Sequence, residues 1–169
     1  MLEDNDFHSL GVYPILSAVQ NSNALRILNL NGNALDDTIA VWLANVLDAT
    51  RALTELHLAR NSLTEKSLGD LSSAIASNDT IDYLDLSWNK IRGPPGPYGG
   101  TPVGVFAKAL KENVRLKVLN LAWNGLGPDG GCAFADMLQL NEVNPALFLK
   151  FSQLIQFSSI FQFISTKQD

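Results

Sequence analysis

One repeated pattern constrains the fold of this chain more than any other feature. The pattern is L-x-x-L-x-L-x-x-N-x-L, with Ile allowed in place of Leu, and it occurs four times in 169 residues. The copies begin at Leu25, Leu53, Ile81 and Leu116. Four chance occurrences in so short a chain are improbable, so the sequence predicts a molecule built from repeated structural units.

The third copy, at residues 81–91, shows why this spacing favours a strand followed by a turn. In an extended segment, Leu84 and Leu86 point to one face, and Tyr83, Asp85 and Ser87 point to the other. The leucines of one unit are buried only against those of the next, so the units stack as a solenoid. We interpret the asparagines at positions 33, 61, 89 and 124 as structural, because their amides satisfy backbone groups in the turn.

The spacing of the copies reveals one insertion. Leu25 to Leu53 and Leu53 to Ile81 are each 28 residues, whereas Ile81 to Leu116 is 35. The extra residues lie in the Pro/Gly-rich stretch at 92–100, which cannot continue a helix or a strand and therefore predicts an exposed loop.

Each predicted strand is followed by a segment with apolar residues at three- and four-residue spacing, which is typical of an amphipathic helix. These segments open at residues with helix-start preferences, namely Asp36, Thr64, Thr101 and Pro128. A 28-residue unit of strand, turn and helix is a leucine-rich repeat. The predicted fold class is α/β: a right-handed horseshoe segment with parallel strands on the concave face and helices on the convex face.

The third and fourth copies also carry a family resemblance. Residues 84–91 (LDLSWNKI), 119–127 (LNLAWNGLG) and the helix end at 109–113 (ALKEN) resemble the ribonuclease-inhibitor-like subfamily of leucine-rich repeats. The nearest likeness is to the leucine-rich-repeat-containing protein 74 type and to the repeat regions of NOD-like receptors. The resemblance covers about residues 12–141. It implies the fold strongly and a function only weakly, and the 92–100 loop departs from it.

The pattern divides the chain into three parts. Residues 1–22 are a partial N-terminal repeat, because Leu2, Asn5 and Phe7 lie 28 residues before their counterparts in the first full copy, and a helix is predicted from Tyr13 to Asn21. Residues 23–141 hold the four repeats. Residues 142–169 hold a degenerate fifth strand at about 146–150 and an apolar tail. We expect a fragment of a longer repeat protein in preference to a chain whose first unit is a degenerate cap.

The tail leaves three interpretations open. Phe157, Ile160, Phe161 and Ile164 share one helical face, as in a cap over the last exposed core. A second interpretation is non-native sequence from a misprocessed transcript. A third is a membrane segment. Its Lys, Gln and Ser residues weaken the membrane interpretation, because a span needs about 20 mostly apolar residues.

Composition limits the classes of binding partner and the cellular compartment that we expect. The net charge of −5 argues against nucleic acid and anionic membranes, which both attract basic surfaces. The single cysteine, Cys132, excludes an internal disulfide and is expected to be buried. Without a secretory signal in the first residues, we expect a cytoplasmic protein.

We find no pattern of a phosphate loop, a zinc hydrolase, a dithiol site or a serine hydrolase, and therefore predict no enzyme, no cofactor and no metal. His57 and Asp85 hold the same position in successive strands and are close enough to hydrogen-bond. They lack a nucleophile, so we interpret them as part of a solvated surface.

The predicted function is an intracellular scaffold that binds a protein partner through the concave sheet face. The candidate binding residues are Asn29, Glu55, His57, Arg60, Tyr83, Asp85, Trp88, Asn120 and Trp123. The two tryptophans hold the same repeat position and should be neighbours, either packed into the turn or contacting a partner. The alternatives are a GTPase-regulating protein, by fold analogy alone, and a truncated product without a role of its own. Self-association through exposed solenoid ends is a further possibility.

Overall fold

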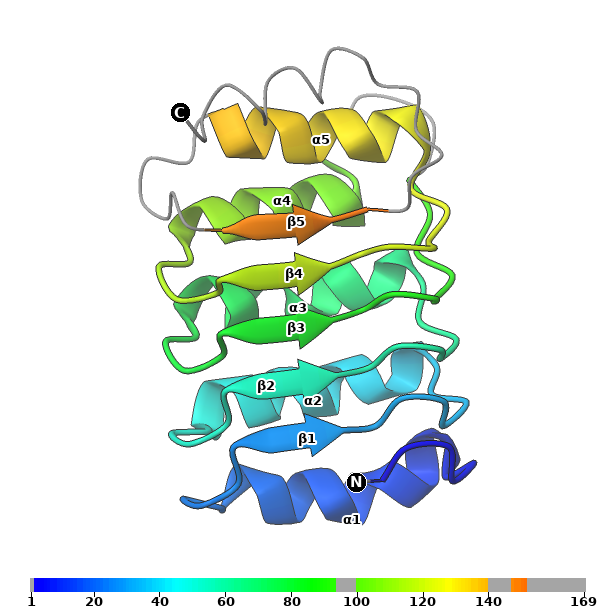
Figure 1. Cartoon of the computed structure of the whole chain (residues 1–169), viewed down its shortest axis with the longest axis vertical. Helices are drawn as coiled ribbons and strands as arrows, with labels where there is room; N and C mark the ends of the chain where they lie inside the picture. Colours follow the sequence, from blue (N-terminus) through cyan, green and yellow to red (C-terminus); the bar gives the residue numbers. More distant parts are fainter. Residues whose placement is uncertain (1, 94–99, 140–146, 152–169) are drawn as a thin grey trace.

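The computed structural model describes residues 2–93, 100–139 and 147–151. Five parallel strands form one sheet in the order β1-β2-β3-β4-β5 (Figure 1). The strands are β1 (Ile27–Asn29), β2 (Glu55–His57), β3 (Tyr83–Asp85), β4 (Val118–Asn120) and β5 (Phe148–Lys150). The predicted leucine-rich repeat α/β fold is therefore confirmed.

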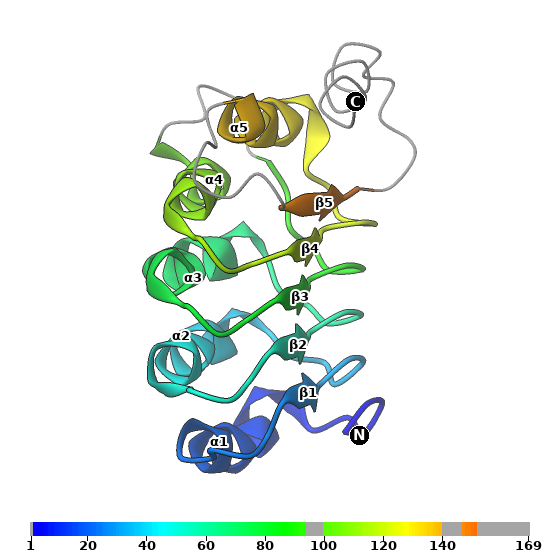
Figure 2. The same cartoon turned by 60° about the vertical axis from the view of Figure 1, so that its left-hand side comes forward.

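The helices all lie on one side of this sheet, as Figure 2 shows. They are α1 (His8–Gln20), the short 3-10 helix η1 (Asp37–Ile39), α2 (Ala40–Ala49), α3 (Glu65–Ser77), α4 (Pro102–Glu112) and α5 (Gly127–Gln139). Thr64 and Thr101 cap α3 and α4 by accepting backbone N–H bonds, as helix-start residues do. None of the helices in the described ranges is long and apolar enough to cross a membrane.

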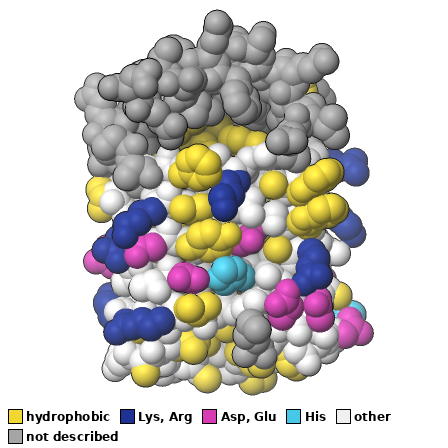
Figure 3. All heavy atoms as spheres, in the orientation of Figure 1, with side chains coloured by type: hydrophobic (Ala, Val, Ile, Leu, Met, Phe, Trp, Pro, Cys, Tyr) yellow, Lys and Arg dark blue, Asp and Glu magenta, His cyan; other side chains and the backbone are white. Residues whose placement is uncertain are grey.

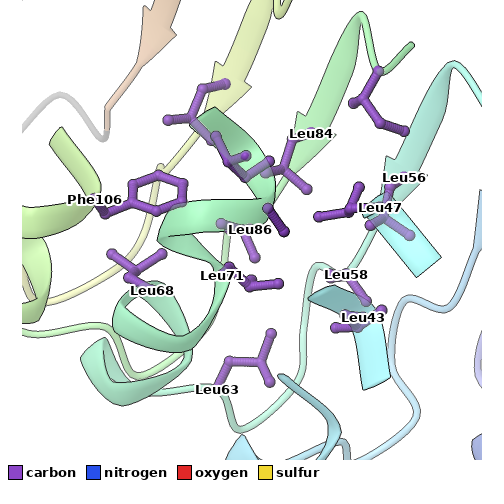
Figure 4. Close-up of a cluster of buried hydrophobic side chains, with 14 of the residues drawn as sticks. Leu43, Leu47, Leu56, Leu58, Leu63, Leu68, Leu71, Leu84, Leu86 and Phe106 are labelled. Carbon is purple, nitrogen blue, oxygen red and sulfur yellow. The ribbon is translucent and has the colours of Figure 1, made fainter. Parts of the chain in front are cut away.

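One continuous apolar core fills the space between the sheet and the helices. Strand pairing places Leu28, Leu56, Leu84 and Leu119 in a single row, and all four are buried. The third leucine of each pattern, such as Leu58 and Leu86, faces the helices deeper in the same core (Figure 4). The repeats thus share one interior, because the inward face of each strand is apolar at every alternate residue.

The pattern asparagines form a ladder of hydrogen bonds between neighbouring repeats. Asn61 Oδ1 accepts from the backbone N–H groups of Asn33 and Leu35, each at 3.0 Å. Asn61 Nδ2 donates to Leu30 O at 3.1 Å and Leu58 O at 3.0 Å. Asn33, Asn89 and Asn124 make the corresponding contacts. Their side chains satisfy buried backbone groups that would otherwise be unpaired, as we expected of a structural role.

A second polar ladder closes the turn between each helix and the next strand. Ser22, Thr50, Asn78 and Asn113 hold equivalent positions, and each side-chain oxygen accepts the N–H of the residue three places later. Asn78 and Asn113 also donate to helix-end carbonyls, Leu47 O at 2.7 Å and Ile75 O at 2.6 Å. These polar side chains thus join each helix end to the adjacent repeat.

Both ends of the described stack differ from the sequence-based expectation. Helix α1 begins at His8, five residues before Tyr13, and the His8 N–H bonds to Asn33 O of the next repeat at 2.9 Å. Strand β5 lies within the predicted range of about 146–150, but it pairs Leu149 with Leu119, two residues beyond the 28-residue spacing. The inserted loop at 94–99 and the tail from residue 152 lie outside the described residues, and predictions about them stay predictions.

Candidate functional site

The sheet face opposite the helices is open and carries six of the nine candidate residues. Charged side chains of both signs and hydrophobic side chains share this face (Figure 3). The six residues come from four neighbouring strands: Asn29, Glu55, His57, Tyr83, Asp85 and Asn120. All are half-buried, because each points out of the sheet between the side chains of the adjacent strands.

Tyr83 lies at the centre of this face. The His57 ring packs against it with 5.0 Å between ring centroids, and Lys150 Nζ lies 6.0 Å from the Tyr83 centroid on the other side. The Tyr83 hydroxyl donates to Asp85 Oδ2 at 3.4 Å. Burial raises the Tyr83 pKa, and the Asp85 carboxylate adds to the effect. The phenol therefore stays protonated and available as a hydrogen-bond donor at neutral pH.

The histidine on this face has a different partner from the one we considered. His57 and Asp85 are paired in register, yet His57 Nε2 lies 3.3 Å from Glu55 Oε2 on its own strand. No serine, threonine or cysteine hydroxyl or thiol accompanies them at hydrogen-bonding distance among the described residues. In the same part of the chain, no group of three or more His, Cys, Asp or Glu side chains gathers to hold a metal ion.

Arg60 is drawn away from the open face by the N-terminal turn. Its Nη2 lies beside Glu3 Oε1 and 3.2 Å from Asp4 Oδ2, and Glu3 also accepts from Asn29 Nδ2 at 3.1 Å. Gly32 holds the repeat position between Asp4 and Arg60. A Cβ at Gly32 would overlap the Asp4 carboxylate, so the absent side chain permits this contact across two repeats.

Trp88 and Trp123 stack on each other in solvent, with 4.7 Å between centroids and an interplanar angle of 18°. They are 53% and 51% exposed, so the interpretation that they pack into the turn is wrong. Both have left-handed backbones, with φ of 56° and 58°, and the asparagines that follow them donate to strand carbonyls inside the turn. That arrangement leaves the indoles outside, at the edge of the sheet.

Sequence reasoning missed two residues of this surface, Lys150 and Glu3. Lys150 was not assigned to the sheet face because it lies in the degenerate fifth repeat, after the last complete copy of the pattern, and only the pairing of β5 with β4 shows its place beside Asn120. Glu3 lies before the first complete repeat, and only the contacts with Asn29 and Arg60 reveal its place. Cys132, expected to be buried, is half-buried.

Comparisons with known proteins support the repeat fold. The family model described as Leucine Rich repeat matches residues 21–44, 77–94 and 112–135. The Tonsoku-like protein of Bos taurus is 31% identical over 143 residues, which are 68% of this chain and 10% of that protein. Leiomodin-1 of Rattus norvegicus is 27% identical over 111 residues, 66% of this chain and 18% of that protein. The chain thus spans less than a fifth of the length of these two relatives.

Solved structures share the fold at lower identity. A structure titled leiomodin-1 actin-binding site 2 has a TM-score of 0.73 at 18% identity and covers 90% of this chain and 84% of that chain. The tropomodulin C-terminal domain of Caenorhabditis elegans has a TM-score of 0.64 at 16% identity, covering 83% and 81%. The narrower resemblance to the protein 74 type and to NOD-like receptors stays a prediction. Three stretches of this chain are thus similar to the Leucine Rich repeat model, and the chain has the leucine-rich repeat fold.

Proposed function

We propose that this chain is a protein-interaction module that holds a protein partner on the open face of its sheet. The observation that carries the proposal is the Tyr83 cluster. It combines an aromatic centre, a donor hydroxyl and charges of both signs on a face that no described helix covers. Among the described residues, no nucleophile and no metal-holding group accompanies this cluster. Its side chains are of the kinds that bind a protein partner.

The physical case rests on preorganisation. Tyr83, His57 and Asp85 stand on strands whose backbones are paired on both sides, so little conformational freedom is lost when a partner binds. Tyrosine is enriched among residues that dominate binding energy, and the surrounding carboxylates and Lys150 supply charge complementarity for selecting a partner.

The likeness to leiomodin-1 suggests which partner to test first. One solved relative is titled an actin-binding site, and its fold covers most of this chain. We therefore propose actin as the first candidate, in an intracellular setting that agrees with the single half-buried cysteine. Co-sedimentation of the purified chain with actin tests this identity separately from the binding face.

The binding face itself is tested by affinity capture with matched variants. Tyr83→Ala combined with Asp85→Asn removes the aromatic centre and one charge. The asparagine keeps an oxygen for the Ser87 N–H, which Asp85 accepts at 2.9 Å. The control is Lys66→Ala combined with Lys108→Ala, both exposed on helices α3 and α4.

We expect the first variant to bind a captured partner at least about tenfold more weakly, because a central aromatic contact is worth about 2 kcal/mol or more. Its unfolding curve should be unchanged. The control should retain the partner. If every partner held by the wild type is held equally by the Tyr83 and Asp85 variant, the open face is not the binding surface.

A further inference from the structure

A second exposed surface lies on the turns that follow β3 and β4. In the first of these turns, Trp88, Lys90 and Arg92 are exposed, whereas Asn89 and Ile91 between them are buried. The backbone is extended enough after Trp88 to form parallel bridges from Lys90 to Thr64 and from Arg92 to Gly125. One indole and two cations therefore project to solvent in a line; we name these residues, with Trp123, the edge strip.

The neighbouring repeat leaves the edge strip uncovered. Trp123 continues the aromatic pair, but the positions equivalent to Lys90 and Arg92 are Gly125 and Gly127. A Cβ on Gly125 would lie 3.1 Å from Arg92 Cγ, and a Cβ on Gly127 would meet nothing within 4 Å. Bare backbone at Gly125 thus lies beside the Arg92 side chain, and no side chain at Gly125 or Gly127 covers the strip.

The preceding repeat does not cover the edge strip either. Arg60 has the position equivalent to Trp88, and its guanidinium would lie against the indole if it followed the ladder. It is held instead by Glu3 and Asp4, three repeats away from Trp88. Among the described residues, no cation–π contact therefore covers the face of Trp88 that is turned towards the Arg60 repeat.

The charge of the edge strip is opposite to that of the chain. Within the described ranges, neither Lys90 nor Arg92 forms an ion pair with an acidic side chain. The nearest carboxylate contact is from Glu65 Oε2, which accepts the backbone N–H of Arg92 at 3.4 Å. In a chain of net charge −5, two cations without ion pairs beside two exposed indoles mark a local positive, apolar surface.

We infer that the edge strip binds an acidic segment of a protein partner that also carries an aromatic or apolar side chain. The apolar side chain packs on the Trp88–Trp123 pair, and the carboxylates pair with Lys90 and Arg92, with Arg92 offering bidentate geometry. Nucleic acids and anionic membranes are disfavoured partners, because their dense rows of phosphates need many cations and the edge strip offers two, on a chain of net charge −5. This surface lies outside the open sheet face and does not depend on it.

The test uses the full chain and three synthetic peptides labelled with fluorescein. The first peptide has Asp and Glu residues around a central Phe; the second has Lys in place of every acidic residue; the third has Ala in place of Phe. Anisotropy reports binding. The emission of Trp88 and Trp123 is followed in a Trp42→Phe background, because the chain has 3 tryptophans and Trp42 lies beside Tyr13.

We expect only the first peptide to bind well and to change the tryptophan emission. Trp88→Ala with Trp123→Ala, and separately Lys90→Ala with Arg92→Ala, should each weaken it at least tenfold, and added salt should reduce the binding that Lys90 and Arg92 provide. Lys66→Ala with Lys108→Ala removes the same charge from α3 and α4 and should leave it unchanged. The Tyr83 and Asp85 variant should also bind normally, which separates this result from the open-face proposal.

Three results would overturn the inference. One is equal binding of the acidic and basic peptides. Another is an affinity that the edge-strip variants do not alter while circular dichroism shows them folded. The third is stronger binding, lost in the same variants, to single-stranded DNA or to vesicles containing phosphatidylserine, which would assign the strip to a nucleic acid or a lipid surface.

Discussion

At the scale of single residues, the asparagine ladder joins the repeats with side-chain hydrogen bonds. The Asn61 side chain is the acceptor for two backbone N–H groups of the preceding repeat and the donor to carbonyls of both repeats. We expect Asn61→Ala to leave the Asn33 and Leu35 N–H groups buried and unpaired. The expected cost is about 2–6 kcal/mol of unfolding free energy, at about 1–3 for each group.

Urea denaturation of the purified chain measures that cost. Asn45→Ala is the matched control, because Asn45 is exposed on α2, and its change should stay within about 0.5 kcal/mol. An Asn61→Ala variant as stable as the control would mean that water or backbone movement satisfies the two N–H groups.

At the scale of elements, Asp37 joins η1 to the start of α3. Its carboxylate accepts from the Thr64 N–H at 2.8 Å, from Thr64 Oγ1 at 2.6 Å and from Ser67 Oγ. Burial by itself would raise the Asp37 pKa, but the hydrogen bonds from Ser67 and Thr64 outweigh it, and the pKa lies below its ordinary value. The folded state therefore binds fewer protons than the unfolded state as the pH falls.

The stability that Asp37 contributes is present above its unfolded pKa and is lost as the pH falls through its lowered folded pKa. We expect Asp37→Asn to be less stable near neutral pH and to show a shallower loss of stability between about pH 5 and pH 3. Thermal melts across this range measure the slope. Asp70→Asn, which removes an exposed charge from α3, should keep the wild-type slope. An unchanged slope in Asp37→Asn would contradict the stabilising role of the Asp37 hydrogen bonds.

At the scale of the whole molecule, one core passes through all the repeats without interruption, from Val12 to Leu147. Leu86→Ala removes a fully buried side chain from its centre and should cost about 2–5 kcal/mol. Because adjacent repeats share that interior, the transition followed by tryptophan fluorescence and the one followed by far-UV circular dichroism should shift together. A shift in only one of them would show that the repeats unfold separately.

Much of this molecule was predictable because its determinants recur locally. The alternation of leucines predicted the strands, their parallel order and the buried row through Leu84, and the asparagine position predicted the turn ladder. Six of the candidate residues lie on the open face as expected, since the outward positions of a strand follow directly from the inward ones. Whether these residues bind a partner stays a prediction.

The sequence by itself determined the repeat unit, the register of β1 to β4 and the division between inward and outward side chains. Only the tertiary structure decided the displaced register of β5, the attachment of Arg60 to Glu3 and Asp4, and the exposure of Trp88 and Trp123. The physical reason is the distance along the chain over which each feature is set. Strand periodicity is a property of neighbours along the chain, whereas a long side chain settles among contacts from several repeats, and those contacts exist only after the repeats have stacked.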